Sequence, residues 1–329
     1  PIETQWTAPV DTGNSAITGY KVFRTLNQYS QSDLPNSSAN ANGVDFTNNE
    51  LLIHGFENSL VTDKSTNSIS VTGEGGFFGG DLSTATFIDE KSYSGYETAE
   101  AHFEFANKGL KLYMVGDGGN TIDEWACATA YDVSTCNFVA ETSTVTGSNP
   151  YGITVSPDGL KIWHIAQDTK TVYEHTLGTA YDISTITLHA VTKVLDSATY
   201  TKGIQWNNDG TKLYFLDSNS PNLDEWVCST AYNISTCQDS TTVALTSASA
   251  WHVQDFQFAN EGKDLFWVNF NDDKVYHNTC STAWLSTSCT TAQTSLDISS
   301  KETTPNGLYI NPVGNKLFIS GNTGDDITE

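Results

Sequence analysis

The sequence predicts an all-β fold: a five-bladed β-propeller with four-stranded antiparallel blades and a small β appendage at the N-terminus. Three observations predict it. A unit of about 50 residues recurs five times, and four short strands in that length are typical of one propeller blade. Apolar and polar residues alternate within each unit, which indicates strands. No segment sustains a 3.6-residue period, which excludes a helical solenoid.

Each unit contains a turn that ends in glycine. The glycines are spaced by 50, 51, 52 and 52 residues. Glycine supplies the positive φ that a short hairpin needs, so each turn is expected to join two antiparallel strands. The five turns are Asn107-Lys108-Gly109, Pro157-Asp158-Gly159, Asn208-Asp209-Gly210, Asn260-Glu261-Gly262 and Pro312-Val313-Gly314.

The strands on either side of the turn have a fixed pattern. In the strand before the turn, a middle residue is flanked by an apolar residue on each side, and this period of two predicts one buried face. The middle residues are expected to line the central channel: Glu104, Thr154, Gln205, Gln257 and Tyr309. The strand after the turn carries an aromatic residue at one place: Tyr113, Trp163, Tyr214, Phe266 and Phe318.

Two further strands complete each unit. The third strand carries Glu in four units and His in one, at equivalent positions: Glu124, Glu174, Glu225, His277 and Glu329. A Thr-Ala-aromatic turn then leads into a short fourth strand in the first four units. The aromatic residues of this turn are Tyr131, Tyr181, Tyr232 and Trp284.

The hairpins SPDGLKIW (156–163) and NDGTKLYF (208–215) resemble those of the YVTN and WD-like superfamily of β-propellers. The resemblance covers residues 96–329, although the WD dipeptide is missing and the period exceeds that of a WD repeat. Such repeats occur in microbial surface proteins and are similar to those of phage tail proteins. The resemblance therefore implies an extracellular location and a binding role, but not one particular reaction.

All six cysteines occupy one place in the repeat and form three couples, each separated by eight residues. The couples are Cys127/Cys136, Cys228/Cys237 and Cys280/Cys289. The second unit lacks cysteines and has Leu177 and Ile186 at the two equivalent positions. Both partners therefore change together, which favours disulfides over zinc ligands or free thiols. Each bridge would close a ten-residue loop worth ~2–3 kcal/mol in the chain-entropy model. Disulfides also predict an oxidising compartment.

The two ends of the propeller are expected to share one blade. The last unit stops at Glu329 before its outer strand, and Leu82–Ile88 matches the outer-strand sequence Val133–Val139. Residues 82–95 would therefore complete the blade formed by 301–329 and close the ring. If a neighbouring subunit supplied this strand instead, the same sequence would polymerise head to tail.

The residues before the propeller, which spans 82–329, carry weaker patterns. Residues 1–24, with Trp6-Thr7-Ala8-Pro9 and Gly19-Tyr20-Lys21-Val22, resemble the B and C strands of a fibronectin type III domain. Residues 25–81 are interpreted as a linker and a short β region. The opening residues lack the features of a signal peptide. A sequence that starts and stops inside recognisable modules suggests a segment of a larger mosaic surface protein, or a small domain assembled between subunits.

The formal charge of −24 argues against some partners. It disfavours nucleic acid and anionic membrane surfaces, because phosphate groups would be repelled. No run of about 18 apolar residues is present to span a bilayer. Sequons at Asn36 and Asn233 permit N-glycosylation in a glycosylating host.

Few residues suggest catalysis or metal binding. The aligned Glu124, Glu174, Glu225, His277 and Glu329 could form a cation or ligand ring, or could occupy a solvated position that duplication copied. The channel positions include one carboxylate and no matching base, and no metal ligand set is evident. Turns such as Asp117–Asn120 could bind Ca²⁺, although turn chemistry alone explains them. Trp125, Trp226 and Trp251 could stack on sugars or pack between blades.

The sequence therefore predicts a non-catalytic extracellular protein of a cell surface, surface filament or virion. Its propeller would serve self-assembly through strand exchange, or adhesion to another surface protein or a glycan, with no required cofactor. The alternative is a propeller enzyme, namely a lactonase, lyase or glycosidase that acts on extracellular carbohydrate.

Overall fold

The computed structural model describes residues 53–54, 62–63, 77, 82, 85–97, 101–145, 149–195, 200–218, 221–245, 252–289 and 294–329. The chain divides into two compact units, residues 1–55 with 61–71, and residues 56–60 with 72–329. In the first, β1 (Ile53–His54) pairs antiparallel with β2 (Thr62–Asp63). The fibronectin-like segment lies outside the described residues, so the predicted domain boundaries stay predictions.

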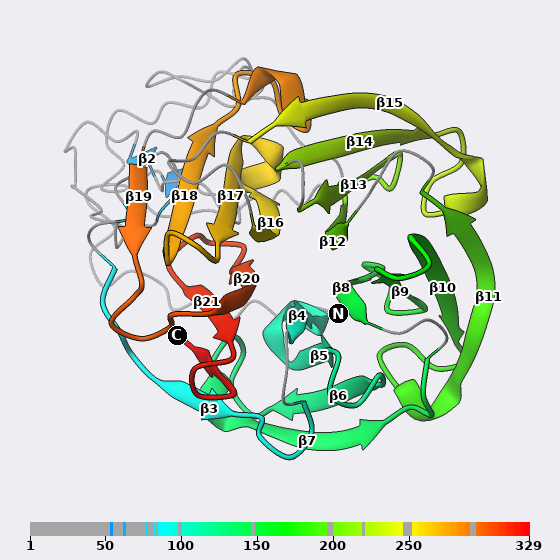
Figure 1. Ribbon diagram of the computed structural model, residues 1–329, viewed down its shortest axis with the longest axis horizontal. Coiled ribbons are helices and arrows are strands. Elements are labelled where there is room, and N and C mark those ends of the chain that lie inside the picture. Colours follow the sequence, from blue (N-terminus) through cyan, green and yellow to red (C-terminus); the bar gives the residue numbers. More distant parts are fainter. Residues whose placement is uncertain are drawn as a thin grey trace, which may run out of the picture. The chain divides into compact units, whose positions relative to one another are not determined.

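The second unit is a five-bladed β-propeller with four-stranded antiparallel blades, as predicted (Figure 1). From the channel outward, blade 1 contains β4 (His102–Ala106), β5 (Lys111–Val115), β6 (Ile122–Cys127) and β7 (Cys136–Glu141). Blade 2 contains β8 (Pro150–Val155), β9 (Lys161–Ala166), β10 (Thr171–Leu177) and β11 (Ile186–Val194). Blade 3 contains β12 (Thr201–Trp206), β13 (Lys212–Asp217), β14 (Asn222–Cys228) and β15 (Cys237–Ala244).

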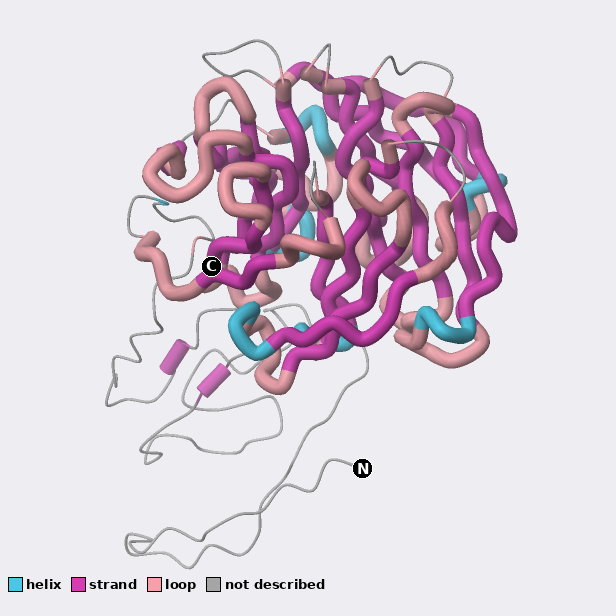
Figure 2. The backbone as a smooth tube through the Cα atoms, turned by 60° about the horizontal axis from the view of Figure 1, so that its bottom comes forward, coloured by secondary structure: helices cyan, strands magenta, loops and turns pink. Residues whose placement is uncertain are grey.

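Blade 4 contains β16 (Val253–Ala259), β17 (Asp264–Asn269), β18 (Lys274–Thr279) and β19 (Thr294–Asp297). Blade 5 contains β20 (Pro305–Ile310), β21 (Leu317–Gly321), β22 (Asp326–Thr328) and β3 (Glu90–Ser92). Helical structure among the described residues is confined to short 3₁₀ turns (Figure 2). They are η3 (Asn107–Gly109), η4 (Val133–Thr135), η5 (Ile183–Thr185), η6 (Ile234–Thr236), η7 (Asn260–Gly262) and η8 (Ser286–Ser288).

The ring is closed by a strand of the same chain. In blade 5, β3 pairs antiparallel with β22, with Lys91 opposite Ile327. Ile88 N donates to the carbonyl oxygen of Glu329 at 2.8 Å, and Glu329 N donates to that of Asp89 at 2.8 Å. The predicted split blade is therefore confirmed in its intramolecular form, and β22 has no free edge for a strand from another subunit.

The turn glycines are required for their backbone conformation and, in the first four blades, also for the close packing of an aromatic ring. Their φ is positive in all five hairpins, from 71° to 83°. In the first four blades the aromatic residue of the Thr-Ala-aromatic turn packs on the glycine, as Tyr131 does on Gly109. A Cβ at Gly109 would lie 2.6 Å from the Tyr131 ring. The glycine thus lets the turn at the end of the third strand fold back over the first hairpin.

Aromatic side chains fill the spaces within and between blades. The second-strand residues Tyr113, Trp163, Tyr214, Phe266 and Phe318 are all fully buried. Trp125 and Trp226 are buried as well, so they pack in the core and do not stack on sugars at the surface. Trp251 lies outside the described residues.

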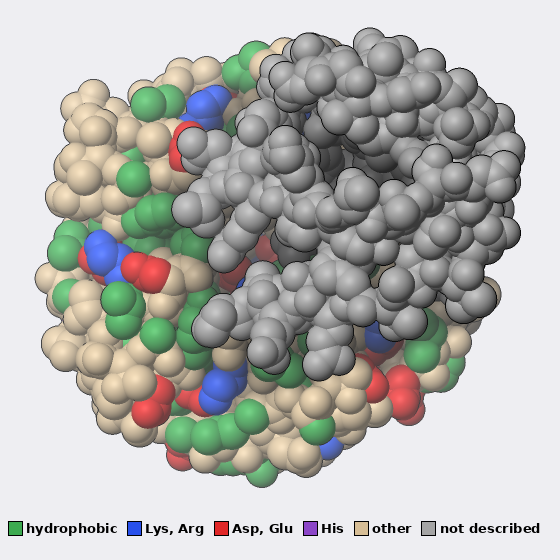
Figure 3. Space-filling model, turned by 180° about the vertical axis from the view of Figure 1, so that it is seen from behind, with side chains coloured by type: hydrophobic (Ala, Val, Ile, Leu, Met, Phe, Trp, Pro, Cys, Tyr) green, Lys and Arg blue, Asp and Glu red, His purple; other side chains and the backbone are tan. Residues whose placement is uncertain are grey.

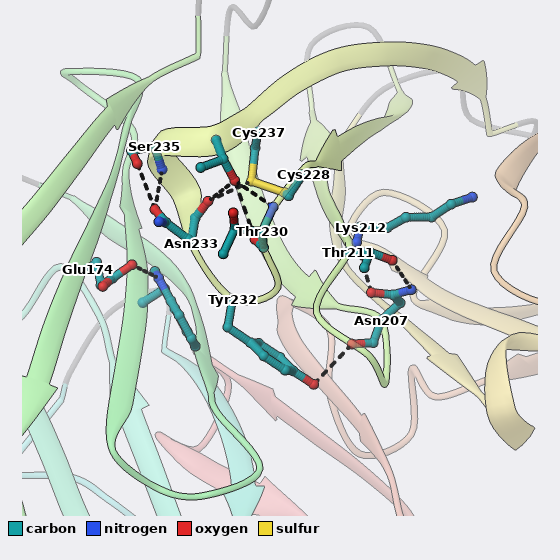
Figure 4. Close-up of a disulfide and its surroundings, with 12 residues drawn as sticks. Glu174, Asn207, Thr211, Lys212, Cys228, Thr230, Tyr232, Asn233, Ser235 and Cys237 are labelled. Atoms are coloured by element: carbon teal, nitrogen blue, oxygen red, sulfur yellow. Dashed lines mark hydrogen bonds between the residues drawn. A yellow bond between two sulfur atoms is a disulfide. The ribbon is translucent and has the colours of Figure 1, made fainter.

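The three predicted disulfides are present: Cys127–Cys136, Cys228–Cys237 and Cys280–Cys289. In blades 1 and 3 the partners face one another across the third and fourth strands, as Cys228 and Cys237 do in Figure 4, whereas Cys280 and Cys289 form a bridge just outside β18 and β19. Leu177 and Ile186 face one another at the same place in blade 2. The bridges indicate a protein exported to an oxidising compartment. None of the described helices has the length and apolar character needed to cross a membrane.

Candidate functional site

The carboxylates predicted as a ring or as a solvated position are neither solvated nor gathered at one point. Glu124, Glu225 and Glu329 are buried, and each binds a lysine of its own blade and a backbone N–H in the 3₁₀ turn of the next blade. Glu225, for example, accepts from Lys212 Nζ at 2.6 Å and from Ser286 N at 3.1 Å. Glu174 binds Lys161 and the indole Nε1 of Trp163. These contacts fasten neighbouring blades, and cation binding there stays a prediction.

Blade 4 makes the corresponding contact with its acidic residue on the second strand and a histidine on the third. Where the other blades have Lys and Glu, it has Asp264 and His277, and His277 Nε2 lies 2.6 Å from Asp264 Oδ1. Both residues are buried. The single His in the third-strand series is therefore explained by a second change on the neighbouring strand, as expected for a paired contact.

The five predicted channel residues do line one cavity. Its volume is about 270 Å³, and it lies at the end of the channel where the first-strand hairpins turn. Glu104, Thr154, Gln205, Gln257 and Tyr309 all contribute to its wall. Further aromatic surface comes from Tyr232 and Trp284, and further amides from Asn207, Asn208 and Asn260.

Among the described residues that line this cavity there is no lysine or arginine. On the face shown in Figure 3, basic side chains are few and lie apart from one another. Lysines of the second strands are held in contacts such as Lys161–Glu174 and Lys212–Glu225. The cavity is therefore a polar and aromatic site with carboxyl groups and without a fixed cation, which suits a neutral polyhydroxylated ligand.

Two glutamines of the channel show what this repeat position does. Gln205 brackets the backbone of Phe258 in the next blade: its Nε2 donates to the carbonyl oxygen at 2.9 Å, and its Oε1 accepts from N–H at 2.7 Å. Gln257 brackets Ile310 in the same way. Each amide acts as donor and acceptor at once, which suits a residue that joins two backbone groups.

Glu104 occupies this position in blade 1. Its Oε2 accepts from Val155 N at 3.1 Å. Burial raises its pKa from 4.5 to about 8, and the charge of Asp255 adds to the increase, although hydrogen bonds from Thr154 and Val155 oppose it. At neutral pH the side chain is therefore mainly a carboxylic acid, able to donate a proton as the glutamine amides do.

The five predicted channel positions contain no base, but two titratable side chains meet two residues earlier on the inner strands. Asp255 reaches across the channel from blade 4, and its Oδ2 lies 3.5 Å from Nδ1 of His102 in blade 1. Asp255 also accepts from the backbone N–H of Leu308 at 3.0 Å. A carboxyl group that is mainly protonated, a carboxylate acceptor and an imidazole thus meet in one channel, and this combination can support acid–base chemistry.

Close packing of the inner strands makes this meeting geometrically feasible. Two residues before the predicted channel residues stand His102, Gly152, Gly203, Asp255 and Gly307. A Cβ at Gly203 would lie 2.6 Å from Asp255 Oδ1, and one at Gly152 would lie 2.9 Å from the Gly203 backbone. The glycines leave room at the axis for the two larger side chains. Three glycines at one repeat position were the sequence signal for this layer.

The remaining predicted sites do not converge on the channel. Asn233 accepts from Ser235 N at 3.1 Å and so caps η6, while Asn36 lies outside the described residues. Among the residues that the structure describes, no three His, Cys, Asp or Glu side chains are grouped to hold a metal ion. The predictions of glycosylation and of Ca²⁺ binding therefore remain predictions.

The chain matches no family model and no curated protein. Its fold is similar to Myxococcus xanthus glutaminyl cyclase, with 12% identity, a TM-score of 0.52, and coverage of 74% of this chain and 95% of that one. It is also similar to the periplasmic gluconolactonase of Pseudomonas aeruginosa, with 11% identity, a TM-score of 0.45, and coverage of 69% and 64%. For a putative 6-phosphogluconolactonase of Bacteroides uniformis the values are 14%, 0.45, 69% and 65%.

These neighbours correct the predicted function. The chain spans less than two thirds of the length of the two lactonases, and at such identities the likeness shows the fold alone. The three neighbours named above nevertheless carry the names of enzymes, and against this finding the prediction of a non-catalytic platform for self-assembly or adhesion is corrected. The enzyme alternative is taken up as a proposal, and the resemblance to YVTN and phage tail proteins stays a prediction.

Proposed function

We propose that the protein is a propeller enzyme that cleaves a C–O bond of an extracellular carbohydrate by acid–base catalysis in the central channel. One observation carries this proposal: Glu104, a half-buried carboxyl group, lies in the wall of a cavity lined by amides and aromatic rings. Carbohydrate ligands offer both hydroxyl groups for the amides and apolar ring faces for the aromatic residues.

The residues have distinct roles in this proposal. Glu104 would act as the general acid and protonate the leaving oxygen of a glycoside or a sugar lactone. A pKa of about 8 keeps this proton in place at neutral pH. Asp255 and His102 would accept the proton of the attacking water. Gln205 and Gln257 would hold the inner strands in register, so that the cavity keeps its shape.

The test uses the isosteric variant Glu104→Gln. Glutamine fills the same repeat position in two other blades, so the variant should keep the blade contact while it loses the acid. The purified protein would be assayed with aryl glycosides and with sugar lactones. We expect kcat to fall by about 10²-fold or more for Glu104→Gln. The wild-type rate should also fall as pH rises through 8.

The matched control is Glu141→Gln, because Glu141 lies exposed on the outer strand β7. This variant should retain the wild-type rate. Wild-type activity in Glu104→Gln would remove Glu104 as the acid. Absence of turnover with every glycoside and lactone in the panel would contradict the proposed reaction class.

A further inference from the structure

The cavity of the central channel has its mouth among the hairpin turns. Exposed residues of the turns between first and second strands form its rim, namely Pro157, Asn208, Glu261 and Pro312. Wall residues such as Thr154 and Gln205 stand three positions before Pro157 and Asn208 on the same strands. Because a strand rises about 3.3 Å per residue, the rim and this level of the wall are roughly 10 Å apart.

Below this level the channel is filled by packed side chains and backbone. His102 of blade 1 and Asp255 of blade 4 meet there, with Nδ1 and Oδ2 3.5 Å apart. Blade 5 stands between blades 1 and 4 in the ring, so this contact crosses the channel. Gly152 and Gly203 are also in close contact, because a Cβ at Gly152 would lie 2.9 Å from the Gly203 backbone. A ligand that enters at the turns therefore stops at this layer.

The size of the cavity limits what can enter it. Its volume of about 270 Å³ lies just below the range of about 300–1,000 Å³ that is usual for small-molecule sites. One pyranose unit with its hydroxyl groups would occupy most of such a space. A second unit would have to lie outside the rim.

One wall of the cavity carries an indole ring. Trp284 stands where each of the three preceding blades has tyrosine, and of those tyrosines Tyr232 also lines the cavity. The Trp284 ring packs on Gly262, where a Cβ would lie 2.5 Å from it, and its centroid is 5.4 Å from that of Phe258. The ring is thereby held in place, and its half-buried surface can stack on the apolar face of a sugar.

We infer that the cavity receives the terminal ring of a saccharide chain, so that the enzyme removes end units and does not cut within the chain. This inference rests on the proposed function, because it names the substrate of the same site. The mouth admits the end of a chain, the packed layer stops it, and the remaining units extend past the rim into solvent. The interior of a chain would need a second opening or an open groove.

The first experiment identifies the sugar. Nitrophenyl glycosides of glucose, galactose, mannose and xylose, in both anomeric forms, are assayed with the wild-type protein beside sugar lactones. Turnover of at least one glycoside is expected. If neither glycosides nor lactones were turned over, the proposed function and this inference would both fail. Turnover of lactones alone would overturn only the inference, because the ring would then not come from a chain end.

The second experiment measures binding without turnover. Glu104→Gln is titrated calorimetrically with the sugar identified above and with its linear tetrasaccharide. We expect the two dissociation constants to agree within about 3-fold, because only one ring lies inside the cavity. An affinity that rises about 10-fold or more for the tetrasaccharide would mean that several rings are bound, which would overturn the inference.

The third experiment analyses the products that the wild-type protein forms from the polysaccharide of the same sugar. The monosaccharide should be the sole early product, and the viscosity of the solution should stay nearly constant. A rapid fall in viscosity with mixed oligosaccharides would show cleavage within the chain. That result would overturn the inference and leave Glu104 as the proposed acid.

Variants then locate the bound ring. Trp284→Tyr should fold normally, because tyrosine packs on the equivalent glycine in three other blades. It should raise KM by about 5-fold or more through weaker stacking and change kcat by less than about 2-fold. Tyr200→Leu is the control, because Tyr200 is exposed and precedes β12, away from the rim. An unchanged KM in Trp284→Tyr would place the ring outside this cavity and overturn the inference.

Discussion

At the scale of single residues, the channel shows one repeat position serving two purposes. Gln205 and Gln257 join adjacent blades with a neutral amide. Glu104 makes the corresponding contact to Val155 with a carboxyl group. Because the carboxyl group is desolvated in the cavity wall and the charge of Asp255 adds to the effect, the pKa of Glu104 is raised and its proton stays bound to a higher pH than on an exposed glutamate. The repeat position that only joins neighbouring blades at Gln205 and Gln257 therefore also provides an acid group at Glu104.

This protonation predicts a pH-dependent stability. The folded-state pKa of about 8 lies above the value of 4.5 for an unperturbed glutamate, so the folded protein binds the proton more tightly. The contribution of Glu104 to stability is complete below pH 4.5 and is lost as pH rises through 8. Glu104→Gln should therefore raise the unfolding temperature relative to wild type by about 3 °C or more at pH 9.

Thermal unfolding of both proteins between pH 4 and pH 9 provides the measurement. The difference in unfolding temperature should shrink towards low pH, where wild-type Glu104 is protonated. A difference that is constant over this range would show that Glu104 does not titrate as described.

At the scale of elements, the blades are joined by pairs of polar side chains, and the acidic partner can stand on either the second or the third strand. Three blades use Lys and Glu to reach the 3₁₀ turn of the next blade, as Lys212 and Glu225 do with Trp284 and Ser286. Blade 4 uses Asp264 and His277 in place of Lys and Glu. The same strand geometry thus accepts the acidic residue on either strand, provided both partners change.

The double variant Asp264→Lys/His277→Glu should convert blade 4 to the pattern of the other blades. Each single change places like or unmatched groups side by side in a buried position, so each should cost about 1–3 kcal/mol. The double variant should recover at least about 1 kcal/mol as coupling energy. Urea unfolding of the four proteins measures this.

The reverse exchange in blade 3 is the matched comparison. Lys212→Asp/Glu225→His should recover less, because the Trp284 carbonyl would lose its ammonium donor and Ser286 its carboxylate acceptor. Coupling energies near zero in blade 4 would mean that the two positions act independently.

At the scale of the whole molecule, ring closure makes the blades depend on one another. Ile327 of β22 is 1% exposed and packs in a cluster with Tyr93 and Phe318 beside blade 1. Ile327→Ala should therefore lower the unfolding free energy by about 2–4 kcal/mol. Val313→Ala, at a turn residue that is 52% exposed, should cost less than about 0.5 kcal/mol. A single shifted calorimetric transition is expected for Ile327→Ala, whereas a separate early transition of blade 5 alone would contradict the dependence.

The ring could be predicted from the sequence because its determinants repeat. Turn glycines such as Gly159 and buried aromatics such as Trp163 recur in every unit, and the cysteines change as couples. The acid–base group could not be predicted in this way. His102 and Asp255 belong to different blades and meet only across the channel, and a bulge between Val253 and Asp255 shifts the local register. The raised pKa of Glu104 likewise depends on burial that only the assembled ring produces.

The shared blade has a consequence for chain connectivity. Since Ile88 and Glu329 are hydrogen-bonded neighbours, a short peptide could join the two ends of the propeller. New termini could then be opened between any two blades, giving a set of circular permutants with the same ring. In most of them all five sheets would be continuous in sequence, so the closing hairpin would form locally and would no longer require the two ends of a long chain to meet.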